Sequence, residues 1–211
     1  MGRGQRTPLR IVVLGAGVGG LASALALGRA GHRVTLLERD AVEAGDPQAS
    51  VEWQRRGIPH FLQAHSLTAR GSLELLREFP DVHQALIEAG ANDIDLASKV
   101  PGGERRPGDE ELRILGVRRP LIEWAFRAAV LAEATIDVRS GVTATGLDGI
   151  GNTMPRVTGV RTPDGSIEAD LVIDAMGRRS PAAGWIVALG GTPMAEETSD
   201  CGVIYYTRYY R

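Results

Sequence analysis

Residues 10–38 read RIVVLGAGVGGLASALALGRAGHRVTLLE, and this stretch decides the fold. A short apolar strand at residues 11–14 runs directly into a glycine-rich turn. The helix-forming sequence LASALALGRAG follows and ends at Gly31, and residues 33–37 are a second strand. A strand–helix–strand unit of about 30 residues predicts two parallel strands joined by a right-handed crossover.

The turn after the first strand has the spacing G-x-G-x-x-G. The first glycine permits a tight turn, the second lets a pyrophosphate approach the backbone, and the third lets helix and strand pack closely. The N-terminus of the helix adds amide donors and a partial positive charge, which suit phosphate groups. The predicted phosphate-binding residues are Gly15, Ala16, Gly17, Val18, Gly19 and Gly20.

Glu38 ends the second strand, 18 residues after Gly20. An acidic residue at this position binds the 2'-hydroxyl of a ribose and disfavours a 2'-phosphate. Arg39 follows it and is included in the predicted cofactor site. The ligand that these residues predict is an adenine dinucleotide with an unphosphorylated ribose, which leaves FAD and NAD.

A second strand-to-glycine junction lies far downstream, in DLVIDAMGRRS at residues 170–180. The sequence before it, RVTGVRTPDGSIEAD, predicts two strands joined by a hairpin turn at residues 163–165. A buried strand over residues 171–175 then reaches Gly177. Two such junctions predict one nucleotide site assembled from distant parts of the chain.

ERD at residues 38–40 and ADLVIDAMGRRS together resemble the FAD-binding domain of flavoprotein monooxygenases of the p-hydroxybenzoate hydroxylase class. Residues 174–177 are similar to the D-A-T-G-like turn of that family, with Met176 in place of threonine. RRPLIEWAFR resembles a helix start of the family and aligns Arg119 with an arginine that holds the flavin nucleotide. RRGIPHFLQAHSL resembles a loop of the bacterial branch, with His60 where glutamine is usual. The resemblance covers roughly residues 10–210.

The resemblance implies that FAD lies with its ADP half over residues 15–20 and Glu38. It also implies that Arg119 neutralises pyrophosphate charge, that a strand near Thr143 offers backbone hydrogen bonds to adenine, and that Gly177 lies against the dinucleotide. The implied activity is a monooxygenase in which a flavin hydroperoxide oxygenates a small organic substrate. NAD(P)H is the implied electron donor and a flavin reductase an implied partner. No catalytic residue is named, because the flavin performs the chemistry.

The predicted fold is α/β, with a Rossmann-like FAD-binding domain over residues 1–180 that combines a parallel sheet with a β-meander. Residues 91–118 are expected to form a loop or hairpin that projects from this domain. Helices are expected over residues 66–78, 82–88 and 121–134. Residues 181–211 are expected to begin a substrate-binding sheet, with CGVIYYTRYYR as a strand. No G-D sequence in a suitable context follows Gly177, so we expect a truncated chain without the isoalloxazine side of the site.

The composition is that of a globular protein, with 43% hydrophobic residues, 24% charged residues and a net charge of -2. This charge gives no reason to expect nucleic acid or an anionic membrane as a partner. Cys201 is the only cysteine, which excludes an internal disulfide, and no metal site is expected. A cytoplasmic location is expected, and the oligomeric state is open. An NAD-dependent dehydrogenase and a non-catalytic fragment are the alternative functions.

Overall fold

The computed structural model describes residues 7–208 apart from 42–44, 54, 56, 59, 101, 152–153 and 205. The chain forms two compact units. The first unit comprises Met1–Val42 and Val130–Tyr205, and the second comprises Glu43–Ala129 and Tyr206–Arg211. The predicted domain boundary after residue 180 stays a prediction.

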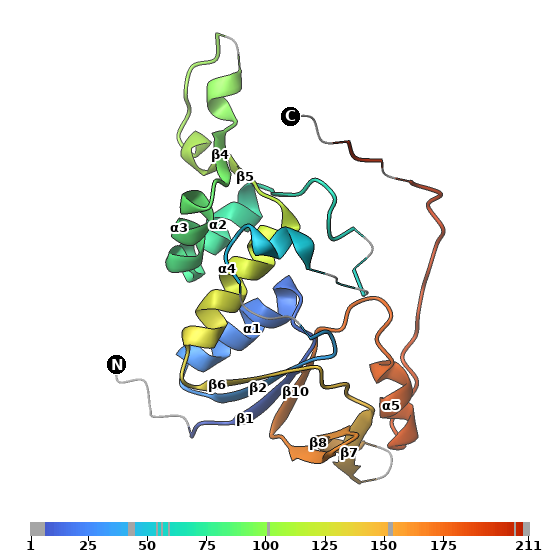
Figure 1. The fold of residues 1–211 in the computed structure, drawn as a ribbon. Coiled ribbons are helices and arrows are strands. Elements are labelled where there is room, and N and C mark those ends of the chain that lie inside the picture. The colour runs from blue at the N-terminus through green and yellow to red at the C-terminus, as the bar shows by residue number, and fades with distance from the viewer. Residues whose placement is uncertain are drawn as a thin grey trace. The chain divides into compact units, whose positions relative to one another are not determined.

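A four-stranded parallel sheet is the centre of the first unit, as the sequence predicts (Figure 1). Its strands lie in the order β10 (Leu171–Asp174), β1 (Arg10–Leu14), β2 (Arg33–Glu38) and β6 (Ile136–Ser140). Helix α1 (Val18–Arg29) connects β1 to β2. β1 therefore lies between β2 and β10, which places the two predicted glycine junctions on neighbouring strands.

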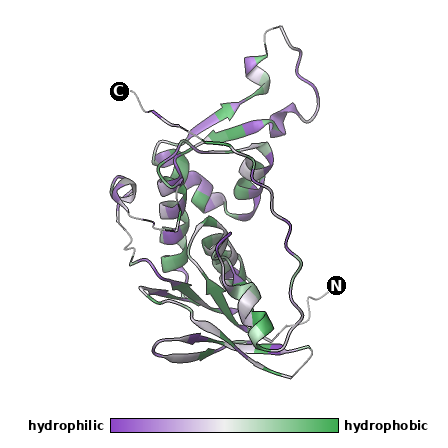
Figure 2. Ribbon diagram, turned by 90° about the vertical axis from the view of Figure 1, so that its right-hand side faces the viewer, coloured by the Kyte–Doolittle hydropathy of each residue, from purple (hydrophilic) through white to green (hydrophobic). Residues whose placement is uncertain are grey.

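The sheet and α1 are held together by apolar packing. Residues 11–14 of β1 are at most 1% exposed, and green, hydrophobic stretches are visible in the strands of the sheets in Figure 2. α1 buries Leu21, Ala24 and Leu25. A Cβ atom added at Gly28 would lie 2.7 Å from Ile136 on β6, so the absence of a side chain there lets helix and sheet approach closely.

The predicted β-meander is the antiparallel sheet of β7 (Gly146–Ile150), β8 (Arg156–Thr162) and β9 (Gly165–Glu168). It packs on the parallel sheet through one hydrophobic cluster. The buried members of that cluster are Val12, Leu14, Leu37, Leu147, Val160 and Ala169. The strands that carry the two glycine junctions thus share a core with the meander.

The chain after residue 180 differs from the prediction. Helix α5 (Ala182–Ala188) follows β10, and its Trp185 and Ile186 pack against the same cluster. The strand predicted for residues 201–211 is not formed among the described residues of that segment. A strand needs a hydrogen-bonded neighbour, and the exposed Val203 and Ile204 have none among the described residues.

The second unit combines a small antiparallel sheet with helices. Its sheet has the order β3 (Ser66–Leu67), β5 (Arg113–Gly116) and β4 (Asn92–Asp95). The α-helices are α2 (Ala69–Glu78), α3 (Pro80–Glu88) and α4 (Arg119–Ala132), and the last turn of α4 belongs to the first unit. Three short 3-10 turns complete the unit, η1 (Ala49–Glu52), η2 (Ala97–Lys99) and η3 (Asp109–Glu111). No helix in the described part of the chain is long and apolar enough to cross a membrane.

Three helices have boundaries that differ from those expected, and one of them is α3, which begins at Pro80 rather than at residue 82. The helix expected from residue 66 begins at Ala69, because Ser66 and Leu67 pair with β5 instead. The helix expected over residues 121–134 begins at Arg119 and ends at Ala132.

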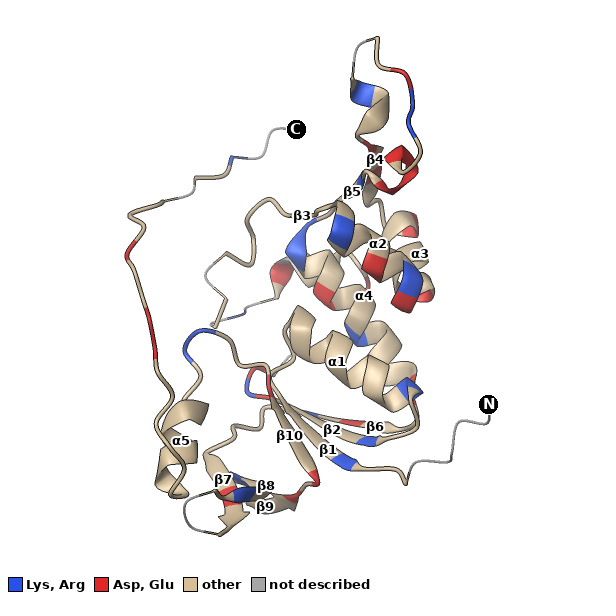
Figure 3. Cartoon of the chain, turned by 180° about the vertical axis from the view of Figure 1, so that it is seen from behind, with Lys and Arg blue, Asp and Glu red and all other residues tan. Residues whose placement is uncertain are grey.

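An ion-pair cluster fixes the start of β1 to the start of β10. Asp170 accepts hydrogen bonds from the backbone N–H of Arg10 at 2.8 Å and from its guanidinium at 3.0 Å, and Arg10 also pairs with Glu168. In Figure 3 the charged residues of these strands lie near the strand ends, and the lengths between are uncharged. The hydrogen bonds from Arg10 lower the pKa of Asp170 to about 2.

We expect Asp170→Asn to remove a pH-dependent part of the free energy of unfolding. Because the folded-state pKa lies below the ordinary value, the ion pair stabilises the fold above pH 4 and is lost as the pH falls from about 4 to about 2. Urea unfolding of both proteins between pH 2 and 7 measures this. The wild-type advantage should be full at pH 5 and vanish near pH 2. Asp164→Asn, in the exposed β8–β9 turn, is the control, and an equal loss there would contradict the prediction.

Candidate functional site

The glycine loop of residues 15–20 lies directly against the end of β10. Gly15 has a φ of +95°, and a Cβ atom added to it would lie 2.9 Å from the carbonyl oxygen of Ala175. A Cβ atom at Gly20 would lie 1.8 Å from the carbonyl oxygen of Gly15 and 3.2 Å from the Cβ of Ala175. The loop and the downstream junction therefore form one continuous surface of main chain.

The N-terminus of α1 offers backbone donors at this surface. Gly17 is the N-cap in an extended conformation, and among the described residues no side chain caps the helix. The amide of Leu21 makes the first hydrogen bond of the helix, to Gly17. The amides before it, at residues 18–20, are of the kind that binds phosphate oxygens, and no acidic residue lies in the first turn to oppose an anion.

Glu38 is the buried carboxylate of the site, at 5% exposure. Its Oε2 accepts a hydrogen bond from the amide of Ala16 at 2.8 Å, and its Oε1 accepts one from the amide of Asp40 at 2.9 Å. The main chain thus fixes the carboxylate at the end of β2, beside the glycine loop. A carboxylate has about four lone-pair sites, so it can accept further hydrogen bonds from ribose hydroxyls.

The segment after β6 also reaches Glu38. The amide of Val142 donates to the backbone carbonyl of Glu38 at 3.0 Å. Thr143 follows, and it is exposed in the connection between β6 and β7 rather than in a strand, which differs from the expectation. Arg39 is also exposed. The backbone of residues 142–143 therefore lies next to the carboxylate.

Asp174 organises the turn after β10. Its carboxylate accepts hydrogen bonds from the amide of Met176 at 2.9 Å and from the hydroxyl of Ser180 at 2.5 Å. Met176 packs against the hydrophobic cluster of the first unit, so this residue replaces the polar contact of a threonine by apolar packing. Gly177 has a φ of +81°, which ends the turn in a conformation that favours glycine.

The structure therefore brings most of the predicted site residues together in the first unit. They are Gly15, Ala16, Gly17, Val18, Gly19, Gly20, Glu38, Arg39, Thr143 and Gly177. Arg119 is the exception, because it begins α4 in the second unit.

Arg119 belongs to a network of side chains in the second unit. Its Nε donates to Oε1 of Glu123 at 3.0 Å, and its Nη1 lies 3.0 Å from Nε2 of His60. The other oxygen of Glu123 lies 3.3 Å from Nε of Arg55, and both of these side chains are at most 3% exposed. Arg119 itself is 18% exposed, so it joins a buried ion pair to the surface.

Two stacked imidazoles adjoin this network. The rings of His60 and His65 have centroids 5.5 Å apart and are inclined by 13°. Burial, followed by the positive charge of Arg119, lowers the pKa of each histidine. Both rings are therefore neutral at pH 7. Gln63, a further polar residue of this loop, pairs with Thr207.

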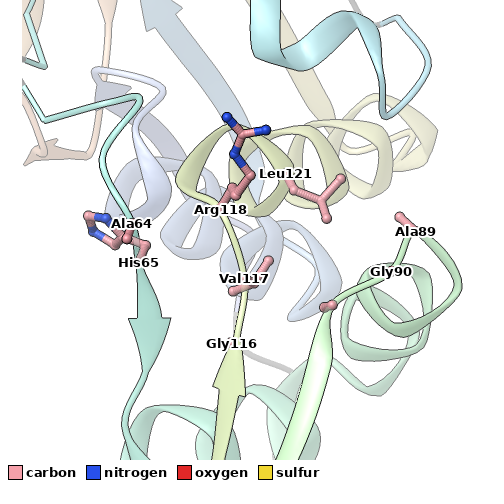
Figure 4. Close-up of a pocket in the computed structure, with 9 residues that line it drawn as sticks. Ala64, His65, Ala89, Gly90, Gly116, Val117, Arg118 and Leu121 are labelled. Atoms are coloured by element: carbon pink, nitrogen blue, oxygen red, sulfur yellow. The ribbon is translucent and has the colours of Figure 1, made fainter. Parts of the chain in front are cut away.

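A small pocket of about 290 Å³ lies within the second unit, beside this network. In Figure 4 Ala64 and His65 lie on the segment that enters β3, and Gly116 and Val117 lie at the end of β5. Arg118 and Leu121 come from the start of α4, and the turn after α3 closes the pocket. Its lining is largely apolar, with His65 and Arg118 as the polar groups.

Sequence reasoning missed the buried network. Arg55 and Glu123 are 68 residues apart and His60 and Arg119 are 59 apart, so no local spacing could have joined them. The one available signal was the spacing of Arg119 and Glu123, which are four residues apart on a helix. Among the described residues, no group of three or more His, Cys, Asp or Glu side chains could hold a metal ion.

We expect Gly20→Ala to destabilise the first unit strongly, because its Cβ would overlap the carbonyl oxygen of Gly15. The free energy of unfolding should fall by more than about 2 kcal/mol, as for other strained backbone sites. Gly19→Ala is the matched control, since a Cβ there meets nothing within 4 Å, and it should stabilise α1 by up to about 1 kcal/mol. Thermal unfolding monitored by circular dichroism measures both. Equal effects would contradict the close approach.

We expect Glu123→Ala to destabilise the protein by about 3–5 kcal/mol, because Arg55 would be left buried without its carboxylate. Glu74→Ala removes a surface pair with Arg70 on α2 and should change stability by less than about 1 kcal/mol. Urea unfolding at pH 7 compares the two variants. A Glu123→Ala loss as small as that of Glu74→Ala would show that the buried pair is not formed.

Comparison with known proteins gives a family match and a curated relative. Residues 10–100 match the model of the family described as FAD dependent oxidoreductase. The chain is 30% identical over 228 residues to Protein Rv3254 of Mycobacterium tuberculosis, an alignment that covers 95% of this chain and 44% of that protein. The chain therefore spans less than half the length of this curated relative.

Solved structures share the fold. PqsL, a probable FAD-dependent monooxygenase from Pseudomonas aeruginosa, is similar with a TM-score of 0.57 and 17% identity, over 79% of this chain and 42% of PqsL. CtdE in complex with FAD is similar with a TM-score of 0.55 and 18% identity, over 82% of this chain and 39% of CtdE. Residues 10–100 thus match an FAD dependent oxidoreductase domain, and the fold of the chain is similar to the folds of PqsL and CtdE.

Proposed function

We propose that the chain binds FAD by its ADP half and forms the nucleotide-binding part of a flavin-dependent monooxygenase. The observation that carries this proposal is the position of Glu38. It is buried and held by the amide of Ala16, so that its carboxylate adjoins the glycine loop that contacts the end of β10. The carboxylate can accept hydrogen bonds from hydroxyl groups of a ligand, and the amides of the loop can donate hydrogen bonds to its phosphates. An adenine dinucleotide has both hydroxyl and phosphate groups.

Each predicted residue has a role in this proposal. The amides of residues 18–20 bind the diphosphate, and Glu38 accepts hydrogen bonds from the ribose hydroxyls. The backbone near Thr143 faces the adenine, Gly177 lets the dinucleotide pass close to the β10 turn, and Arg39 lies at the exposed edge. Arg119 is proposed as a cofactor-binding residue on the family resemblance.

The flavin, when bound, supplies the redox chemistry and the reaction with dioxygen. The residues of this chain bind and orient the nucleotide, and none of them is assigned a proton-transfer step. We propose a small organic substrate, NAD(P)H as the electron source, a flavin reductase as a candidate partner, and a cytoplasmic location. The resemblance to the p-hydroxybenzoate hydroxylase class supports these finer assignments.

We expect Glu38→Gln to weaken FAD binding by about tenfold or more, since hydrogen bonds to a charged acceptor contribute about 1.5–3 kcal/mol. Titration of the purified protein with FAD, followed by flavin fluorescence, measures the dissociation constant. ADP should compete with FAD, and FMN, which lacks the AMP portion of FAD, should not. Asp137→Asn on neighbouring β6 is the control and should leave the affinity unchanged.

Two outcomes would overturn the proposal. One is the absence of FAD binding by the wild-type chain, with or without binding of NAD in its place. The other is FAD binding that ADP does not displace, because the glycine loop would then not be the site.

A further inference from the structure

We propose that Arg178 and Arg179, on the turn after β10, bind the diphosphate of the nucleotide that occupies the glycine loop. The inference rests on the proposed function, because an ADP-containing nucleotide is the ligand in question. Both arginines belong to the first unit, as do the glycine loop and Glu38, so one compact unit carries the amides, the carboxylate and the two positive charges.

The turn after β10 begins in contact with the glycine loop. A Cβ atom added at Gly15 would lie 2.9 Å from the carbonyl oxygen of Ala175 and 3.3 Å from the Cα of Met176. Arg178 and Arg179 follow Ala175 by three and four residues, so even a fully extended chain would place their Cα atoms within about 15 Å of it. Both arginines therefore stand near the loop, at the carboxyl end of a parallel strand, where open α/β sheets bind their ligands.

Hydrogen bonds hold this turn in one shape. The amide of Ser180 donates to the carbonyl oxygen of Gly177 at 2.9 Å, which makes Arg178 and Arg179 the two central residues of a β-turn. The hydroxyl of Ser180 donates to the carboxylate of Asp174 at 2.5 Å and ties the end of the turn to β10. The backbone that carries the two arginines is thus fixed before a ligand arrives, which lowers the entropy cost of binding.

The two positive charges of this turn have no counter-charge among the described residues. Arg178 and Arg179 are exposed, and neither forms an ion pair or a side-chain hydrogen bond within the described part of the chain. The acids nearby are engaged, Asp174 by Ser180 and Glu38 by two backbone amides. The turn itself does not require arginine, because Gly, Pro, Asn, Asp and Ser are the residues that favour turns. The pair is therefore available to an anion.

The glycine loop offers hydrogen-bond donors but no full positive charge. Residues 15–20 contain no charged side chain, and Glu38 adds a negative charge beside them. The partial charge at the N-terminus of α1 is only about half an elementary charge, so it balances a diphosphate incompletely. A guanidinium stays protonated and presents a planar fork of donors that pairs with phosphate oxygens. The two arginines thus supply the charge that the amides lack.

Single substitutions test the inference in the full chain. Arg178→Gln and Arg179→Gln each remove one positive charge from the turn. Arg33→Gln is the matched control, because it removes one positive charge from the exposed start of β2, at the opposite end of the strand from Glu38. Affinities for FAD, ADP and adenosine are measured by isothermal titration calorimetry at about 50 mM and about 500 mM salt. Circular dichroism confirms that each variant is folded.

At the lower salt concentration each turn variant should bind FAD and ADP about threefold more weakly than the wild type, and the double variant about tenfold more weakly. Arg33→Gln should bind both as the wild type does. At the higher salt concentration the differences should fall below about twofold, because salt screens exposed charges. Adenosine has no phosphate, so all of the proteins should bind it equally.

Two results would overturn the role of the arginines and leave the FAD proposal standing. One is an equal loss of affinity for adenosine, which would show that the turn shapes the site without pairing with phosphate. The other is wild-type affinity for FAD and ADP in both turn variants at the lower salt concentration.

Nitrogen NMR of the free protein, titrated with inorganic pyrophosphate, gives a readout that does not depend on FAD. The side-chain Nε–H signals of Arg178 and Arg179 should shift, and that of Arg33 should not. Unchanged signals for the turn arginines would overturn the inference. Pyrophosphate shifts in a wild-type chain that does not bind FAD would overturn the FAD proposal instead and leave the anion-binding role of the pair standing.

Discussion

The contact between two stretches of bare main chain, at Gly20 and Gly15, is the constraint on which the first unit depends. A side chain at Gly20 would overlap the Gly15 carbonyl, and one at Gly15 would crowd Ala175. Because no Cβ intervenes, α1 begins immediately after β1 and its first amides lie beside the end of β10. The parallel order β10-β1-β2 then places the Glu38 carboxylate on the same side.

The parts of the fold that were predictable from sequence are those set by local pattern. The apolar runs, the glycine spacing and the Pro163–Gly165 turn led to the correct sheet and meander. Helix α5 was not predicted, because its short sequence contains Gly184 and its packing of Trp185 on a distant core cannot be read locally. The tail was predicted as a strand from β-branched and aromatic residues, but composition does not supply a neighbouring strand.

The same distinction between local sequence pattern and distant contacts applies to the candidate site. The glycine loop and Glu38 could be predicted, because their spacing along one strand–helix–strand unit also fixes their spacing in the fold. The partners of Arg119 could not, since His60 is 59 residues away on a loop without regular structure. Resemblance to a family identified Arg119 itself, but it gave no account of what holds the side chain.

The two groups also differ in how they are held, and this decides which substitutions each tolerates. Backbone amides fix Glu38, so its setting depends on the path of the chain and hardly on neighbouring side chains. Side chains fix Arg119, so its setting depends on the identity of Glu123 and His60. Lysine could not replace this arginine, because an ammonium has a single nitrogen and cannot pair with Glu123 and His60 through separate atoms. The planar guanidinium is what lets one residue contact both partners.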